Sequence, residues 1–317
     1  MKRIKLTYIV IALFGMSALM LGSCNKEKLE KGSNDYTSVS NLSQDELEVE
    51  EATNESMEDV EGLLSGHGNG NGGFKSTDHM PPCNATVDST QVVNDTITIY
   101  ITYDGLSCNG RKYRSGQVEI RKPVGQNFGM PGATVRIKHI NFTITRVGSD
   151  RSITINSTKT FTNVTGGFIF MLGHNGFDAL VHRIEGNINV SFNNGTARSW
   201  SVARQRTYTG TRGNLLLTVD GFGTSGDYTN LVTWGTNRAG EQFYTSITQS
   251  IVFRQTCGWD PVSGSKFHQI PEADKSALVI FGYDSNNQPV TGDECPTHYR
   301  IDWQNGTYTG TRFVPLP

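Results

Sequence analysis

The chain has 317 residues, a formal net charge of −2, 18% charged residues and 35 glycines. With 36% hydrophobic residues, this composition excludes a wholly disordered protein, a collagen and a coiled coil. The near-neutral charge provides no field that would attract nucleic acid, so we expect no nucleic-acid partner.

Residues 1–23 have the form of a lipoprotein signal peptide. Three basic residues among the first five precede an apolar run from Ile9 to Leu21, which is long enough for a signal core and short for a membrane-spanning helix. Leu21-Gly22-Ser23-Cys24 resembles a bacterial lipobox, which implies that Cys24 becomes the mature N-terminus and carries acyl chains such as palmitate. Several chains anchor stably, because each buried CH₂ contributes about 0.8 kcal/mol. An ordinary secretion signal with an incidental cysteine is the alternative.

Residues 24–74 are expected to form a disordered tether. Residues 25–62 contain 12 acidic residues and three lysines, a net charge of −9, and Tyr36 is their only aromatic residue. Such a stretch buries too little apolar surface to offset the entropy of ordering. Gly66–Gly73 has the glycine-rich composition of a flexible linker. We expect a spacer that holds the folded part away from the membrane; a partner site in the acidic run is the alternative.

One helix signal lies inside this tether. Ser43 and Glu46 have the spacing of a capping box, and Leu42 and Leu47 that of a hydrophobic staple. The apolar positions farther along, Met57 among them, are sparse. The sequence by itself therefore does not predict a stable helix here.

Residues 75–317 predict an all-β domain. Residues 96–103 alternate isoleucine with threonine or tyrosine, the period of two expected of a half-buried strand. Asn-Gly and Asp-Gly pairs, which suit tight hairpin turns, separate further runs of this kind. A change of phase between Ile137 and Ile140 predicts a β-bulge. We predict an antiparallel β-meander folded as one or two β-sandwiches. The other predicted strands are residues 116–122, 133–147, 151–163, 187–192, 197–209, 214–220, 228–235, 241–254, 276–283, 297–303 and 307–313.

Two internal echoes favour two related β modules. Thr207–Arg212 recurs letter for letter as Thr307–Arg312, and Tyr100–Asp104 resembles Ile280–Asp284. These echoes place a module boundary near 225–255. Chance similarity in a chain rich in threonine and glycine is the alternative.

The cysteines that remain after Cys24 suit an oxidising compartment, because their number is even. Four cysteines allow three pairings, and the module echo favours Cys83–Cys108 and Cys257–Cys295. Each bridge is expected to stabilise the fold by about 3–4 kcal/mol. A zinc site is disfavoured, because no Cys-x-x-Cys pair is present.

The positions of the histidines do not indicate a metal site. His174, Asp178 and His182 would align on a helix, but their surroundings predict turn and strand. Four residues of a strand span about 13 Å, which is too far to share one ion. The sequence has no nucleophile elbow, zinc-protease motif or P-loop. We therefore expect no metal and no cofactor.

The strand-associated acids predict no catalytic pair. Glycoside hydrolysis needs two carboxyl groups at a fixed separation, and nothing in the sequence brings two acids together. The protein is therefore predicted not to be an enzyme. The acids concerned are Asp104, Asp220, Asp284 and Asp302.

The tryptophans divide into core and surface candidates. Trp200 and Trp303 alternate in phase with their strand neighbours, which predicts that they fill the core. Trp234 stands beside Gly235 and a turn at residues 237–240. We predict Trp234 as the residue best placed to stack on a ligand such as a sugar.

Several of these features together are similar to outer-membrane lipoproteins of Bacteroidota. They are the lipobox, the acidic tether, the strand Tyr100–Gly105 followed by Cys108, the Gly110–Gly116 hairpin and the closing Tyr-Asp module with Cys295. The resemblance implies an outer-membrane lipid anchor and a β-rich domain. It carries no known activity, so it implies no catalytic residue.

Three functions follow as hypotheses. The first is a lipid-anchored β protein with a binding or structural role at the outer membrane, facing the periplasm or the cell surface. The second is a glycan-active enzyme or a carbohydrate-binding or adhesion module, and the third is an accessory component of an envelope assembly. The expected partners are the membrane, through the lipid anchor, and glycans or envelope proteins.

Overall fold

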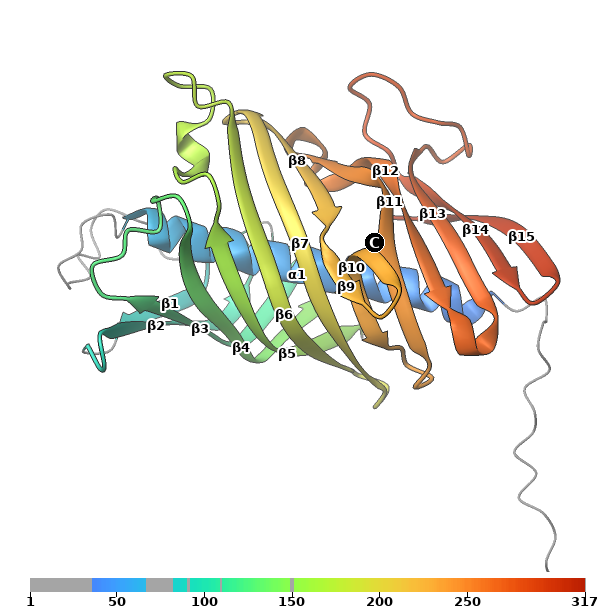
Figure 1. Ribbon diagram of the computed structural model, residues 1–317, viewed down its shortest axis with the longest axis horizontal. Coiled ribbons are helices and arrows are strands. Elements are labelled where there is room, and N and C mark those ends of the chain that lie inside the picture. Colours follow the sequence, from blue (N-terminus) through green and yellow to red (C-terminus); the bar gives the residue numbers. More distant parts are fainter. Residues whose placement is uncertain (1–35, 67–81, 90–91, 109, 149–150, 317) are drawn as a thin grey trace, which may run out of the picture.

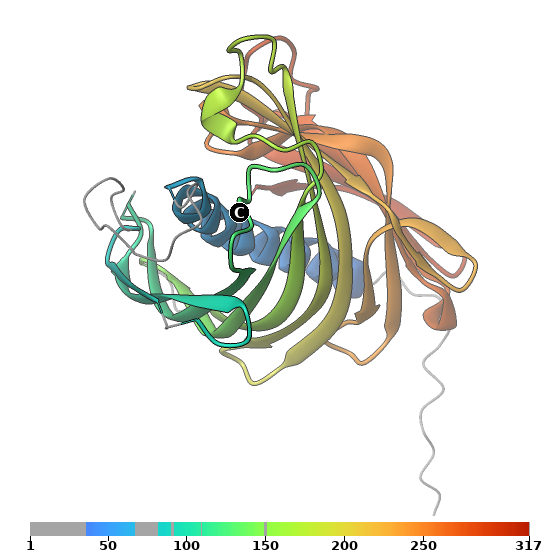
Figure 2. The same cartoon turned by 60° about the vertical axis from the view of Figure 1, so that its left-hand side comes forward.

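The computed structural model describes residues 36–66, 82–89, 92–108, 110–148 and 151–316. One strongly curved antiparallel sheet wraps around a long helix, α1 (Thr37–Gly66), which runs across the strands (Figure 1). Viewed from nearer its end, α1 lies in the hollow of the sheet (Figure 2). The signal peptide, Cys24 and residues 67–74 of the predicted linker lie outside the described residues.

The sheet has 15 strands, and strands that are consecutive in the chain are mostly neighbours in the sheet. The path runs from β1 to β7, then from β10 to β15, while β8 pairs with β7 and β11 and β9 pairs with β10. The strands are β1 (Ala85–Ser89), β2 (Thr96–Leu106), β3 (Lys112–Pro123), β4 (Ala133–Arg146), β5 (Ser152–Asn163), β6 (Ala179–Phe192), β7 (Ala197–Thr211), β8 (Asn214–Gly221), β9 (Gly223–Ser225), β10 (Tyr228–Thr236), β11 (Gln242–Arg254), β12 (Asp260–Ile270), β13 (Lys275–Tyr283), β14 (His298–Asn305) and β15 (Tyr308–Pro315). Three short 3₁₀ helices are η1 (Ile169–Met171), η2 (Gln255–Cys257) and η3 (Pro271–Ala273).

The predicted antiparallel β class is confirmed. The strands form one continuous sheet, and its concave face packs on α1, where a sandwich would place a second sheet. β10 and β11 continue this sheet through residues 225–255, at the predicted module boundary. The two predicted modules therefore share one sheet and one core.

Residues 37–66 of the predicted tether form α1, so the expectation of disorder is corrected for this stretch. The stretch contains no proline and many good helix formers, which permits a helix. Its apolar residues, such as Leu42 and Val60, are fully buried against the sheet. Ser43 is not a cap but lies within the helix, where its hydroxyl is 2.9 Å from His268. Packing against the sheet thus supplies the burial that the acidic segment lacks by itself.

The inward face of the sheet carries the apolar core. Ile101, Ile120 and Ile137 are fully buried and belong to one cluster with the apolar residues of α1. The prediction that Trp200 and Trp303 fill the core is confirmed, since both are buried in that cluster.

Irregular positions in the strands help the sheet to curve. Gly116 has a φ of 94°, and a Cβ there would lie 2.2 Å from the carbonyl oxygen of Asn141. The register between β4 and β5 shifts between His139 and Phe142, and Asn141 has a φ of 47°. A bulge is therefore present, but it lies just after Ile140 and not between Ile137 and Ile140 as predicted. Such irregularities increase local bend and twist.

Candidate functional site

A cavity of about 340 Å³ lies beside the C-terminal half of α1. One wall is α1 between Glu51 and Asp59, and a second is the turn between β2 and β3 with the start of β3. The third comes from β7, β8 and β11 and from residues 257–260, where η2 leads into β12. The volume is typical of small-molecule sites, which are a few hundred Å³.

Both predicted disulfides are confirmed, and each holds one wall of this cavity. Cys83 and Cys108 are bonded across 25 residues of chain, and Cys257 and Cys295 across 38. Both walls contribute a cysteine to the cavity lining: Cys108 comes from the turn between β2 and β3, and Cys257 comes from η2. The bridges therefore fix two wall segments that belong to no regular strand.

Ion pairs attach α1 to the β3 side of the cavity. The Lys112 Nζ atom lies 2.6 Å from a carboxylate oxygen of both Glu51 and Glu55. Arg114 lies 3.0 Å from Asp59, which also accepts a 2.8 Å hydrogen bond from the Tyr103 hydroxyl. These cations have carboxylate partners within the protein.

Arg206 of β7 stands apart from these pairs. It is 3% exposed, it lines the cavity, and its guanidinium lies 5.2 Å from the centre of the Tyr208 ring. Within the described residues, its Nε and Nη2 atoms are buried and have no hydrogen-bond partner. Buried donors of this kind are rare, since nearly all buried polar groups are paired.

Two carboxyl groups of the cavity have raised pKa values. Burial raises the pKa of Glu58 to about 7, with Arg206 opposing the rise and Asp59 adding to it. Glu58 lines the cavity and is partly accessible to solvent there, since the residue as a whole is exposed. Burial, assisted by the charge of Glu51, raises the pKa of Asp260 to about 6. Both groups can change protonation near neutral pH.

An apolar wall faces this polar set. Leu217 of β8 and Phe253 of β11 are buried beside the cavity, and Trp259 is partly exposed there. The Trp259 backbone has a φ of 66°, and its ring meets Tyr208 edge-on at 6.4 Å. The cavity thus combines one aromatic and aliphatic side with one charged side.

A buried polar layer joins the N-terminal half of α1 to the sheet. Glu46 accepts hydrogen bonds from Thr233, Thr245 and Lys266 at 2.6–2.9 Å. Burial alone would raise the pKa of Glu46, but Lys266 and His268 hold it well below its usual range. Asp45 similarly pairs with Arg198 at 2.9 Å. The charges of these buried pairs are compensated within the protein, and the pairs hold α1 against the sheet.

His174, Asp178 and His182, which were not predicted to share a metal ion, lie in different environments. His174 and Asp178 are exposed in the loop before β6, whereas His182 is buried on β6 with Glu61 at 3.7 Å. Over the ranges that the structure describes, no group of three or more His, Cys, Asp or Glu residues could hold a metal ion.

The four strand-associated acids that were considered for a catalytic pair make separate contacts, and the described cavity wall includes none of them. Asp104 accepts a hydrogen bond from Tyr113, Asp220 from Ser250 and Asp302 from Thr311. Asp284 caps its own turn through the backbone amides of Asn286 and Gln288. The acids are therefore parts of turns and strand pairs.

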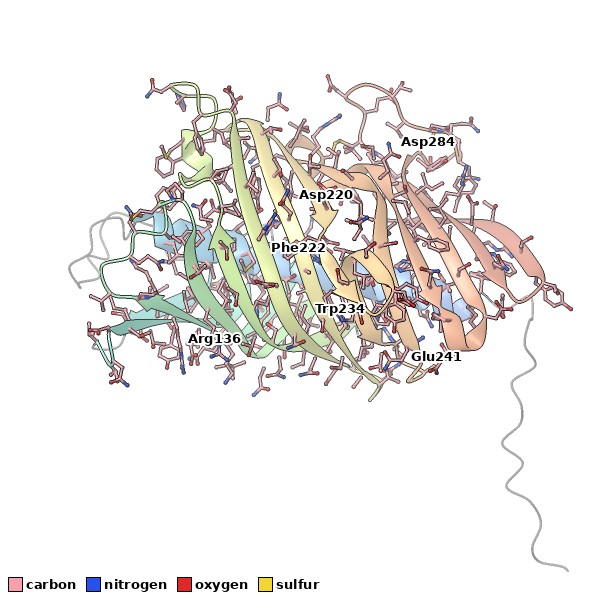
Figure 3. All side chains as sticks on the ribbon, viewed as in Figure 1. Arg136, Asp220, Phe222, Trp234, Glu241 and Asp284 are labelled. Carbon is pink, nitrogen blue, oxygen red and sulfur yellow. A yellow bond between two sulfur atoms is a disulfide. The ribbon has the colours of Figure 1, made fainter. Side chains whose placement is uncertain are left out.

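Trp234 lies on the outer face of β10, on the side of the sheet away from α1 (Figure 3). It is half-buried, and its ring covers Gly223 of β9. It pairs in register with Tyr244, whose ring stacks on Tyr228 at 3.9 Å. Three aromatic side chains therefore share one patch of the outer face.

Sequence patterns did not single out the cavity residues Arg206, Glu58, Trp259 and Asp260. One signal was present, because Arg204 and Arg206 alternate in phase with Trp200, which was predicted to face inward. Arginines in phase with a buried tryptophan indicate a charged patch on the inner face, and the acidic residues 25–62 are its complement. The spacing along the chain contains no signal for the approach of residues 257–260 to α1.

No family model matches this chain, and searches of curated proteins and of solved structures also find no match. In the part of the chain that the structure describes, no helix combines the length and apolar character needed to cross a bilayer.

Proposed function

We propose that this protein is a lipid-anchored binding protein of the bacterial outer membrane that takes a small molecule into the cavity beside α1. The observation that carries the binding role is the cavity itself. It has a volume of about 340 Å³, which lies in the range of small-molecule sites, and it offers an apolar side and a charged side. The disulfides and ion pairs that fix its walls support a preformed site.

The membrane location rests on the lipobox at Leu21–Cys24. Cleavage before Cys24 and acylation of that residue would anchor the chain, with residues 25–36 between the anchor and α1. Mass spectrometry of the membrane-extracted protein tests this, because the mature chain should begin with an acylated Cys24. A leader that remains attached, or a cleaved chain without acyl groups, would contradict the anchor.

Filling the cavity tests the binding role. Asn54 of α1 lines the cavity, so Asn54→Trp should occupy much of its volume. In an NMR screen of small organic fragments, those that bind the wild-type protein should shift the indole resonance of Trp259. The same fragments should cause no such shift in Asn54→Trp. Asn187→Trp, the same change on the exposed side of β6, is the control. Fragments that never perturb Trp259, or that bind Asn54→Trp equally well, would refute the role.

The outer aromatic patch supports a second candidate, a carbohydrate-binding surface. Trp234, Tyr228 and Tyr244 offer partly exposed ring faces on a rigid sheet. Aromatic side chains with an apolar body and a polar end are enriched at binding surfaces. This candidate uses the opposite face from the cavity, so both sites could exist on one molecule.

A glycan array tests this patch directly. Trp234→Ala should abolish binding of any glycan that the wild-type protein retains. Trp259→Ala, which alters the cavity and leaves the outer face unchanged, should preserve that binding. Retention by Trp234→Ala would exclude the patch.

A further inference from the structure

We propose that the cavity selects a small organic anion with an apolar body, whose anionic group pairs with Arg206 while its body lies against Leu217, Phe253 and Trp259. The inference rests on the binding role proposed above and names the ligand class for that site.

Arg206 is a buried cation whose hydrogen-bond donors are not all used within the described residues. A guanidinium is always charged and offers five N–H donors in a planar fork that matches carboxylate, sulfonate and phosphate groups. The Arg206 side chain is buried, and two of its nitrogen atoms have no acceptor among the described residues. A buried charge with unpaired donors is costly unless a partner satisfies it. An anion in the adjoining cavity is such a partner.

Two other basic side chains that line the cavity are already paired. Lys112 is held between Glu51 and Glu55, and Arg114 is held by Asp59. A ligand would have to displace these carboxylates to use either cation. Arg206 requires no such displacement, because its Nε and Nη2 atoms make no hydrogen bond to any described residue.

The acids nearest to Arg206 do not replace a ligand. Glu61 interacts with Arg206 through space and accepts a 3.4 Å hydrogen bond from the amide nitrogen of Ile169, but burial raises the pKa of Glu61 to about 7. Glu58 interacts with Arg206 through space, and burial raises the pKa of Glu58 to about 7. At neutral pH the Glu58 carboxyl is therefore partly protonated and compensates Arg206 incompletely.

The apolar side fixes the second property of the ligand. Phe253 and Leu217 come from β11 and β8, which pair with each other at these two residues. Trp259 adds a partly exposed aromatic side chain to the same cavity. A bare inorganic anion would leave this side unused, whereas an anion on a ring or short chain would bury apolar area at about 25 cal/mol per Å².

Three probes of nearly equal shape test the inference on the mature full-length protein. They are 1-naphthoate, 1-naphthalenemethanol and 1-naphthylmethylamine, which are an anion, a neutral molecule and a cation at pH 7. Isothermal titration calorimetry should give about tenfold or more tighter binding of naphthoate than of the alcohol, the size expected for a charged hydrogen bond. The amine should bind more weakly still.

Arg206→Gln should remove this preference and leave the affinity for the alcohol within about threefold, as expected when only the charged contact is lost. Arg136→Gln, on the exposed face of β4 (Figure 3), should behave as the wild type.

Glu58→Gln should change affinity in the opposite direction and tighten naphthoate binding by a few-fold, because it removes the competing carboxylate. This variant keeps the test valid if Arg206→Gln fails to fold.

The outcomes separate the two proposals. If no probe binds the wild-type protein, both the small-molecule role and the ligand class are refuted. If the alcohol or the amine binds as tightly as naphthoate, or if Glu58→Gln weakens naphthoate, the binding role stands and the anionic class is wrong.

Discussion

Glu46 of α1 and Lys266 of β12 lie 2.9 Å apart, with side chains only 2% and 3% exposed. The contact joins residues 220 positions apart in the chain. It exemplifies how a helix with many carboxylates sits inside a sheet, because the inner face supplies a cation or hydroxyl to the acids that are buried deepest. Charge complementarity therefore accompanies apolar packing in holding α1.

Breaking that pair should be costly. Glu46→Gln leaves Lys266 buried without a counter-charge, so we expect a loss of about 3–5 kcal/mol in the free energy of unfolding. Urea denaturation followed by circular dichroism measures it. Arg121→Gln, which breaks the more exposed pair between Arg121 and Glu119, should cost about 1 kcal/mol or less. Equal losses in the two variants would show that the buried layer does not hold α1.

The Cys257–Cys295 bridge should stabilise both the fold and the cavity. Replacing both cysteines with serine opens a loop whose ends are 38 residues apart and should cost about 4 kcal/mol in the chain-entropy estimate. Because Cys257 lines the cavity, binding of 1-naphthoate should weaken as well. The variant with serine at both Cys83 and Cys108, which loses the other disulfide, is the matched comparison. An unchanged denaturation midpoint would contradict this role.

Glu61 should make stability depend on pH. Burial raises the pKa of Glu61 from 4.5 to about 7, with Arg206 and the Ile169 amide opposing the rise and Glu58 adding to it. The folded state favours the protonated carboxyl, so the cost is absent below pH 4.5 and complete above pH 7. Relative to wild type, Glu61→Gln should therefore gain on the order of 3 kcal/mol between pH 4.5 and pH 8.

His182 faces Glu61 and titrates in a different range, since burial, assisted by Arg206, lowers its pKa to about 3. Its cost develops as the pH falls below 6.5 in wild type and Glu61→Gln alike, so the difference in stability between these two proteins from pH 4.5 to pH 8 isolates Glu61 from His182. Glu185→Gln, on the exposed face of β6, should follow the wild-type pH profile. A Glu61→Gln profile parallel to wild type would refute the assignment.

Gly116 should tolerate no side chain. Gly116→Ala places a Cβ 2.2 Å from the Asn141 carbonyl oxygen at a φ of 94°, so we expect a loss of about 3 kcal/mol or more. Gly195→Ala is the control, because Gly195 has a φ of 81° and open space around it. It should show only the backbone cost of about 1 kcal/mol. Thermal denaturation of the two variants measures the difference, and equal losses would show that the close approach is relaxed.

Local patterns were enough to predict most of the sheet. Alternation over residues 96–103 predicts β2 (Thr96–Leu106), and the Asn194-Gly195 turn predicts the hairpin between β6 and β7. The strand β12 (Asp260–Ile270) was missed, because Gly264 and a run of polar residues interrupt its alternation. The strand β1 was also missed, because it has only five residues.

Local patterns in the sequence predict the antiparallel strands and their turns and favour the observed pairing of the cysteines, because these features depend on neighbouring residues and on a repeated motif. Only the tertiary structure decided that residues 37–66 fold, since their helix depends on cations and apolar side chains from distant strands such as β7 and β12. The cavity has the same origin. Arg206, Glu58 and Trp259 are distant in the chain, and they meet because the sheet curves around α1.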